Sequence, residues 1–181
     1  MNWRVSALDR YTLVSNSDSH SPTPLRIGRE ANILEIPRLT YGGIVDTIMH
    51  HKERLTTIEV DPSYGKYHWT GHRDCNITVP PSEAVRLKST CPICGKKMTK
   101  GVAERVEELA DRAEGVVPRG AQKYIKVLPL SEIVAVVMRK DVFSADVQKR
   151  YWGIVSKFAG EIEALAYAPR EALVDACGEE I

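Results

Sequence analysis

Two pairs of metal-ligand side chains dominate the middle of this 181-residue chain: Gly71-His72-Arg73-Asp74-Cys75 and Cys91-Pro92-Ile93-Cys94-Gly95-Lys96. In each pair two residues separate the ligands, a spacing that allows both ligands of a tight turn to bind one metal ion. Fifteen residues lie between the two pairs. Tetrahedral zinc takes four nitrogen or sulfur ligands, and a closed set leaves no position for a substrate. The spacing therefore predicts a structural Zn²⁺ site made of His72, Cys75, Cys91 and Cys94.

Two alternatives stay open for this segment. His68 lies four residues before His72 and can replace it as the nitrogen ligand. The cysteines can also be unrelated buried thiols beside a surface histidine, but paired spacing in a lysine-rich, apolar-poor segment disfavours that interpretation. The remaining cysteine, Cys177, is expected to be an ordinary core or surface thiol of the last helix.

The charges nearly cancel overall but are sorted along the chain, with 25 Lys and Arg against 24 Asp and Glu. Residues 63–103 carry seven basic and two acidic side chains, whereas residues 1–62 and 127–181 are acidic in sum. Such a local positive field attracts anionic partners such as nucleic acid. The residues predicted to bind a nucleic-acid backbone are Lys66, Arg73, Lys96, Lys97 and Lys100. Tyr67 and Trp69 can stack on bases or pack against the metal-binding turns, and the sequence favours neither.

The composition excludes several classes of protein. A hydrophobic fraction of 43% with 27% charged residues is typical of a folded domain. The longest apolar run, residues 133–138, is too short to cross a membrane, and the N-terminus lacks the layout of a secretory signal. We find no phosphate loop, nucleophile elbow or dinucleotide fingerprint. With too few cysteines for a disulfide framework, a cytoplasmic location is the expectation.

The order of elements predicts an α/β fold. Residues 11–15 are rich in β-formers and run into a polar loop, so we expect a strand there, followed by a helix over 42–52 and a strand over 56–60. Later helices are expected over 102–113, from Pro129 (where a strand is also possible), after a cap at Ser144, and from Pro169. The first of these is expected to bury one apolar face: Val102, Val106, Leu109, Ala110 and Ala113. The helix after Ser144 is expected to bury another: Val147, Tyr151, Ile154, Val155 and Phe158.

Asp18 and His20 form a second candidate metal-binding pair. Residues two apart on an extended backbone project to the same side, so this carboxylate and imidazole can meet one ion. By itself such a triplet is usually a solvated loop.

The residues around this pair resemble a known metal motif. The stretch 8–22, Leu-Asp-Arg-Tyr-Thr-Leu-Val-Ser-Asn-Ser-Asp-Ser-His-Ser-Pro, with Gly-Arg-Glu-Ala-Asn at 28–32, resembles the last metal motif of PHP-domain metallohydrolases. More narrowly it resembles that of the endonuclease Q family. The likeness continues through Thr57-Ile58-Glu59, residues 65–68, both metal-binding turns and residues 105–110, and so covers most of 3–135.

The resemblance implies the end of a PHP-type distorted β/α barrel over 1–62, a zinc-binding module over 63–101 and a helical region over 102–181. It implies a repair endonuclease that nicks DNA on the 5′ side of deaminated bases such as uracil and hypoxanthine. Asp18 and His20 match the family's last catalytic metal ligands, for Mg²⁺, Mn²⁺ or Zn²⁺. Clustered divalent ions generate hydroxide and stabilise the attacking and leaving oxygens.

The sequence departs from the family pattern at the other catalytic ligands. No His-x-His occurs, and two ligands rarely hold a catalytic metal cluster. We therefore expect a C-terminal part of an endonuclease Q-like protein, inactive alone, whose partners are DNA and the missing N-terminal PHP portion. His50 and His51 are expected to end an exposed helix rather than to bind metal, because cations suit a helix C-terminus.

Three functions from different classes follow. The first is a component of a metal-dependent DNA repair endonuclease, which depends on Asp18 and His20. The second is a non-enzymatic zinc module that binds nucleic acid. The third is a PHP-type phosphoesterase acting on small phosphate esters, a task for which a basic zinc module is surplus.

Overall fold

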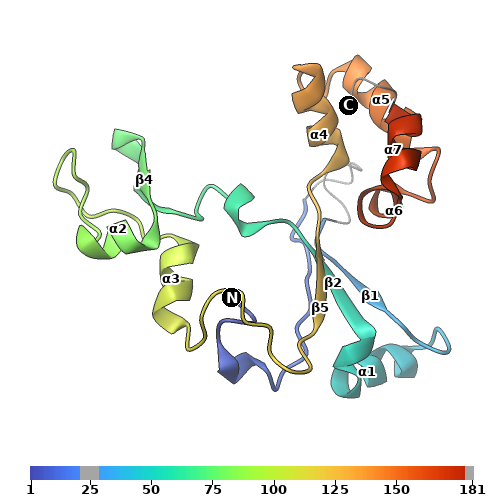
Figure 1. Ribbon diagram of the computed structural model, residues 1–181, viewed down its shortest axis with the longest axis horizontal. Helices are drawn as coiled ribbons and strands as arrows, with labels where there is room; N and C mark the ends of the chain where they lie inside the picture. Colours follow the sequence, from blue (N-terminus) through green and yellow to red (C-terminus); the bar gives the residue numbers. More distant parts are fainter. Residues whose placement is uncertain (21–28, 178–181) are drawn as a thin grey trace. The chain divides into compact units, whose positions relative to one another are not determined.

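The computed structural model describes residues 1–20 and 29–177, which divide into two compact units. The first unit contains Met1–Leu13, Ile36–Arg54 and Asp61–Gln122; the second contains Val14–Glu35, Leu55–Val60 and Lys123–Ile181. Both units therefore combine segments that are far apart in the sequence (Figure 1). The three-part division at residues 62 and 101 stays a prediction. Ser21, Pro22 and Gly28 of the quoted metal motif lie outside the described residues.

The second unit contains a mixed three-stranded sheet in the order β1 (Ala31–Leu34), β2 (Leu55–Glu59), β5 (Lys123–Lys126). Strand β1 is antiparallel to β2, with Ala31 opposite Ile58, and β5 is parallel to β2. Strand β2 is central and the most buried of the three, which agrees with the strand expected at 56–60. Helices and small sheets together make the chain α/β, as expected, while the barrel remnant stays a prediction.

The strand expected at residues 11–15 does not form; the segment has no regular secondary structure and pairs with no strand among the described residues. Two side-chain amides take the place of a neighbouring strand. In the first unit the Gln122 side chain accepts from Leu13 N (3.0 Å) and donates to Leu13 O (2.6 Å). In the second, the Asn32 side chain accepts from Ser15 N (2.9 Å) and donates to Ser15 O (2.8 Å). The backbone groups of Leu13 and Ser15 are thus satisfied without a ladder, so β propensity did not decide the outcome.

Helix α1 (Tyr41–His50) confirms the helix expected at 42–52. Thr40 caps it, because its hydroxyl accepts from Gly43 N at 3.0 Å. His50 is the last helical residue, and the His51 ring lies 3.4 Å from the Asp46 carboxylate and 3.3 Å from that of Glu53. His50 is exposed, and the two histidines lie at the end of the helix, as expected.

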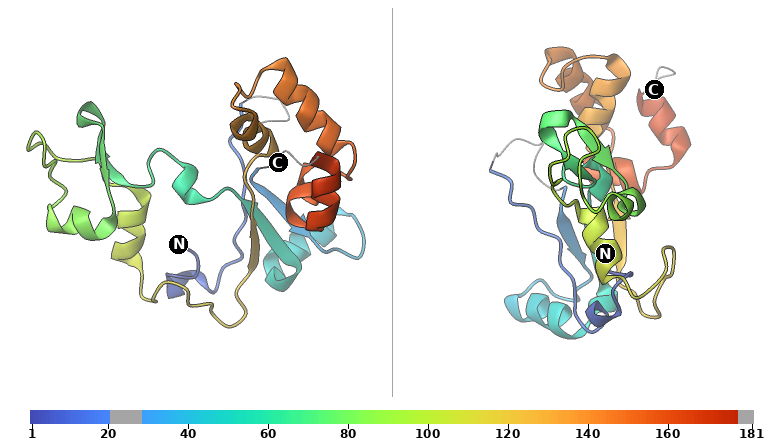
Figure 2. Two further views of the ribbon diagram at one scale, coloured as in Figure 1. Left: turned by 45° about the horizontal axis from the view of Figure 1, so that its top comes forward. Right: turned by 90° about the vertical axis from the view of Figure 1, so that its left-hand side faces the viewer.

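Four helices follow the sheet in the second unit: α4 (Leu130–Met138), α5 (Ala145–Val155), α6 (Glu161–Ala166) and α7 (Arg170–Cys177). Figure 2 shows them, in orange and red, gathered together in both views. Their core confirms the stripe expected after Ser144, with Val147, Tyr151 and Ile154 buried and Cys177 against them. Residue Pro129 precedes a helix, not the alternative strand. Among the described residues, no helix has both the length and the apolar character needed to span a bilayer.

Helix α3 (Val102–Leu109) is shorter than expected, and its expected apolar face is wrong. Val102 and Leu109 are exposed, whereas Glu104 is buried with an exposed fraction of 4%. The Glu104 carboxylate accepts hydrogen bonds from the hydroxyls of Thr70 and Ser89. Hydrogen-bond partners from distant residues therefore allow α3 to bury a polar side chain in place of its expected apolar face.

Replacing Glu104 with alanine is expected to lower the free energy of unfolding of the first unit by about 1–3 kcal/mol, because the two hydroxyls lose their buried acceptor. Glu104→Gln keeps an acceptor and should cost less. Glu108→Ala is the matched control, since its carboxylate pairs with Lys100 and Arg105 at the surface and is worth under about 1 kcal/mol. Chemical denaturation of the three variants measures this; equal losses at positions 104 and 108 would contradict it.

Charge pairs hold the first residues of the chain within the first unit. Arg4 donates to both carboxylate oxygens of Glu107 at 2.9 Å, and Arg112 makes a similar two-point contact with Asp9. Hydrogen bonding to Arg112 lowers the pKa of Asp9. No local pattern in the sequence predicts these two charge pairs, because the partners in each are about a hundred residues apart.

Candidate metal centre and nucleic-acid interface

The first metal-binding turn is the tip of a β-hairpin. His72 ends β3 (Thr70–His72), Cys75 ends a short 3-10 turn, and β4 (Ile77–Val79) returns antiparallel to β3. Asn76 closes the turn in the left-handed conformation (φ 48°), which asparagine tolerates better than most residues. The hairpin therefore presents the imidazole and the thiol from the two ends of one short turn.

Two backbone hydrogen bonds of Cys91 close the second metal-binding turn. Cys91 O accepts from Gly95 N at 2.9 Å, and Cys91 N donates to Lys96 O at 2.8 Å. Gly95 has a φ of 73°, and a Cβ there would meet no atom within 4 Å, so glycine is favoured by the backbone conformation rather than by space. Cys91 is buried in a small core with Val79, Ala84 and Met98.

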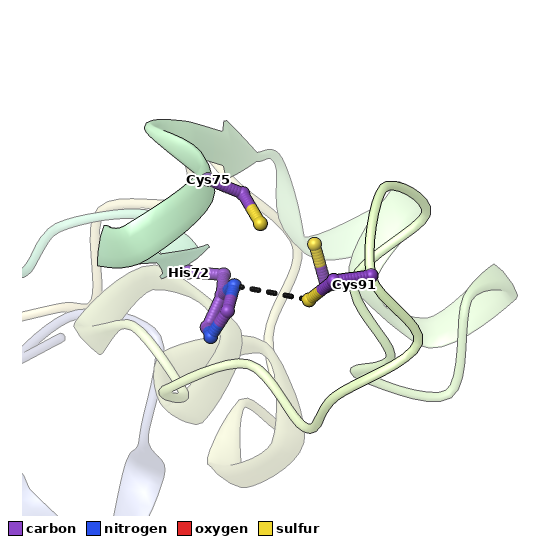
Figure 3. A group of neighbouring side chains, drawn as sticks. His72, Cys75 and Cys91 are labelled. Atoms are coloured by element: carbon purple, nitrogen blue, oxygen red, sulfur yellow. Dashed lines mark hydrogen bonds between the residues drawn. The ribbon is translucent and has the colours of Figure 1, made fainter.

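The two turns bring the four predicted ligands together. The ligand atoms of His72, Cys75, Cys91 and Cys94 all lie within 4.8 Å of one another, and His72 Nδ1 is 3.4 Å from Cys94 Sγ. Figure 3 shows His72 and Cys75 from the hairpin facing Cys91 from the second turn. A tetrahedral ion with ligand bonds of about 2.0–2.3 Å sets its ligands roughly 3.5–3.8 Å apart, so this donor set fits a metal ion.

His68 does not belong to this cluster. Its ring lies edge-on to Trp69, with ring centroids 4.7 Å apart, and its Nδ1 is buried without a hydrogen-bond partner among residues 1–20 and 29–177. The structure thus favours His72 over His68 as the nitrogen ligand.

The thiols of the cluster differ in proton affinity when no metal is bound. Hydrogen bonding with Cys94 raises the pKa of Cys75 to about 12. Burial tends to raise the pKa of Cys91, but hydrogen bonds from the backbone of Cys94 and Ile93, together with those to the Cys94 and Cys75 thiols, lower it to about 7. Near neutral pH the metal-free cluster therefore holds Cys75 as a neutral thiol.

Metal binding is expected to release protons, because only thiolates coordinate. The apparent affinity for Zn²⁺ should fall by about tenfold per pH unit for each proton released as the pH is lowered from 8 to 6. Competition with a chromophoric chelator in unbuffered and buffered solution measures both the affinity and the protons. An affinity that is independent of pH would rule out cysteine coordination.

Asp18 and His20 lie in the second unit, exposed on a segment without regular secondary structure before residue 21. No third histidine, cysteine or acidic residue of the described chain joins them in a metal-binding group. On the described residues alone the pair does not make a catalytic metal site, in line with the missing ligands noted in the sequence.

The predicted phosphate-binding residues separate into two kinds. Arg73, Lys96 and Lys97 are exposed and make no ion pair within the described residues. Lys100 is paired with Glu108 and lies 3.6 Å from Glu104, so its charge is compensated within the module. Lys88 is an exposed cation of the same segment that the prediction omitted.

Tyr67 and Trp69 do not pack into the core beside the metal-binding turns. Their exposed fractions are 63% and 41%, and the core residues around Cys91 do not include them. The Lys66 ammonium lies 4.9 Å from the centre of the Tyr67 ring. Of the two interpretations that the sequence left open, exposure favours the one in which these rings are available to a ligand.

Comparison of sequences gives two relatives and one family model. The chain is 35% identical over 167 residues to the uncharacterized protein MJ0043 of Methanocaldococcus jannaschii, covering 88% of this chain and 21% of that protein. It is 33% identical over 135 residues to the uncharacterized protein YqxK of Bacillus subtilis, covering 73% and 33%. Residues 129–181 match the model of the MJ0043 C-terminal domain.

Comparison of structures gives two similar folds. One is the crystal structure of the lesion-specific endonuclease PfuEndoQ from Pyrococcus furiosus, with a TM-score of 0.81, 33% identity, and coverage of 97% of this chain and 46% of that one. The other is endonuclease Q in complex with a 27-mer duplex substrate that has an abasic lesion at the active site, with a TM-score of 0.83, 32% identity, and coverage of 97% and 44%. The chain spans less than half the length of each relative it matches.

Proposed function

Because this chain is endonuclease Q-like in sequence and fold, we propose that it is part of a metal-dependent DNA repair endonuclease that nicks DNA on the 5′ side of deaminated bases. The observation that carries the proposal is the match of 97% of the chain, at a TM-score of 0.83, to a protein described as bound to a lesion-containing duplex. At 32% identity this likeness extends beyond the fold to the sequence.

In this proposal the four-residue cluster holds a structural Zn²⁺. The ion fastens the hairpin to the second turn, and the exposed cations Arg73, Lys96 and Lys97 then face the DNA backbone from a rigid frame. Their lack of acidic partners among the described residues supports the assignment, because each unpaired cation can replace a condensed counterion on a phosphate.

Asp18 and His20 are proposed to complete a catalytic metal site whose other ligands lie outside the described residues. Bound divalent ions would supply hydroxide and charge stabilisation for phosphodiester hydrolysis. The exposure of both side chains supports this role, since they are available to an ion that other residues also bind. The chain by itself is accordingly proposed to be inactive.

Nicking of duplexes that contain one deoxyuridine or one deoxyinosine, with Mg²⁺ or Mn²⁺, tests the proposal. The chain alone should not cleave, whereas joining it to the part of an endonuclease Q-like relative that it does not cover should produce a nick 5′ of the lesion. In the joined protein Asp18→Asn should slow cleavage by at least about 100-fold, and the exposed Glu35→Gln should not. Cleavage that survives Asp18→Asn would show that the ligand assignment is wrong.

A second function is favoured by one specific observation. The described residues contain a closed four-ligand cluster beside unpaired cations, but no catalytic metal group, which is the arrangement of a non-enzymatic nucleic-acid-binding zinc module. Salt-sensitive DNA binding by a joined protein that never cleaves would support this alternative. Turnover of small phosphate esters without DNA cleavage would instead support a phosphoesterase.

A further inference from the structure

Three exposed aromatic side chains lie within six residues, immediately before the metal-binding hairpin. The exposed fractions are 51% for Tyr64, 63% for Tyr67 and 41% for Trp69. Together with Lys66 they are called here the aromatic platform. Exposed aromatic rings that cluster in one short segment are unusual on a folded surface and mark a binding site more often than scattered ones do.

The backbone of the platform is held in place by helix α3. Tyr67 O accepts from Val102 N at 2.9 Å and His68 O accepts from Ala103 N at 3.0 Å. Gly101 packs directly against the same backbone: a Cβ added to it would lie 2.3 Å from the carbonyl carbon of Trp69. Close approach and two hydrogen bonds thus fix the chain that carries the rings, which lowers the entropy cost of using them.

The Trp69 ring is also held by its neighbour. It stands edge-on to His68 at an interplanar angle of 86°, a favourable arrangement for aromatic rings. The buried Nδ1 of His68 has no hydrogen-bond partner among the described residues, so this atom does not hold the ring in place. The Trp69 ring is therefore 41% exposed while it contacts the His68 ring.

Two cations adjoin the platform along the chain. The Lys66 ammonium lies over the Tyr67 ring, and Arg73 follows at the tip of the adjoining hairpin. Aromatic rings interleaved with cations are what proteins use to bind single-stranded nucleic acid: the bases stack on the rings and the cations follow the phosphates.

We propose that the aromatic platform binds an unpaired nucleobase of damaged DNA by stacking on Tyr67 and Trp69. The inference rests on the proposed function and adds a site to it. Every base presents a π-face, so the platform binds an unpaired base without regard to its identity. It therefore stabilises DNA in which a lesion has freed a base from the helix, and contributes little to binding of a fully paired duplex.

The test compares the whole metal-loaded chain on three DNAs: a paired duplex, the same duplex with an abasic site, and the single strand. Tyr67→Ala and Trp69→Ala should each weaken binding to the last two by about fivefold to 100-fold, with a smaller loss on the paired duplex. Tyr67→Phe and Trp69→Phe should retain most of the affinity. Tyr41→Ala is the control, because Tyr41 is 85% exposed and lies outside the platform.

Photo-crosslinking distinguishes direct contact with a base from a purely structural role of Tyr67 and Trp69. A 5-iodouracil placed opposite the abasic site should crosslink to Tyr67 or Trp69, as mapped by mass spectrometry. One result would overturn the base-binding role of the platform and leave the proposed function standing. In it, the wild type binds DNA in a salt-sensitive way, the affinities of Tyr67→Ala and Trp69→Ala equal that of Tyr41→Ala, and the crosslinks map to other residues. Failure of the wild type to bind any of the three DNAs would overturn both.

Discussion

Replacing Cys91 with serine is expected to abolish metal binding and to unfold the hairpin and the second turn together. Cys91 is both a ligand and a member of the small core with Val79, Ala84 and Met98, so the substitution removes a bond to the ion and a buried contact. Structural zinc contributes an apparent binding energy of about 10–16 kcal/mol in small zinc modules. A core of four buried residues cannot replace that contribution.

Elemental analysis and limited proteolysis measure this effect. The wild type should retain about one zinc ion per chain, and Cys91→Ser should lose it and become susceptible to cleavage between residues 63 and 101. Cys94→Ser should behave in the same way. Cys177→Ser is the control: it alters a buried cysteine of the helical core in the second unit and should leave the metal content unchanged. A Cys91→Ser protein with undiminished zinc would disprove the ligand assignment.

Removing three cations of the metal-binding module is expected to produce the second large effect. The triple variant Arg73→Ala, Lys96→Ala, Lys97→Ala should bind duplex DNA at least about 100-fold more weakly at low salt, because each phosphate contact releases a counterion. The slope of log affinity against log salt should decrease by about three in magnitude, at about 0.9 per contact.

Lys100→Ala provides the matched comparison within the same module. Because Lys100 is paired with Glu108 and lies beside Glu104, its removal should change the slope less than Lys97→Ala does. Fluorescence anisotropy with one labelled duplex over a range of salt concentrations distinguishes the cases. Equal slopes for the wild type and the triple variant would show that these cations do not face the DNA.

Local signals in the sequence predicted the parts of the fold that local chemistry decides. The spacing His72-x-x-Cys75 and Cys91-x-x-Cys94 identified four side chains that the structure brings together, since a short turn determines its own geometry. The helix after Ser144 was predictable for a similar reason, because its cap and its apolar stripe lie within fifteen residues of each other.

Long-range partners decided the elements that the sequence could not predict. Strand β5 reads Lys-Tyr-Ile-Lys and pairs with β2 from more than sixty residues away, so its four residues give no strong local signal. The buried carboxylate of Glu104 depends on Thr70 and Ser89, and the segment at Leu13 depends on Gln122. At Glu104 and at Leu13, distant polar side chains override the local preference for an apolar helix face or a strand ladder.

The most direct test of the whole account is the affinity of the intact chain for a lesion-containing duplex before and after its metal ion is removed. If the cluster shapes the DNA-binding surface, chelation should weaken binding by at least about tenfold, and re-addition of one equivalent of Zn²⁺ should restore it. A metal-free chain that binds the duplex as tightly as the loaded one would contradict the account.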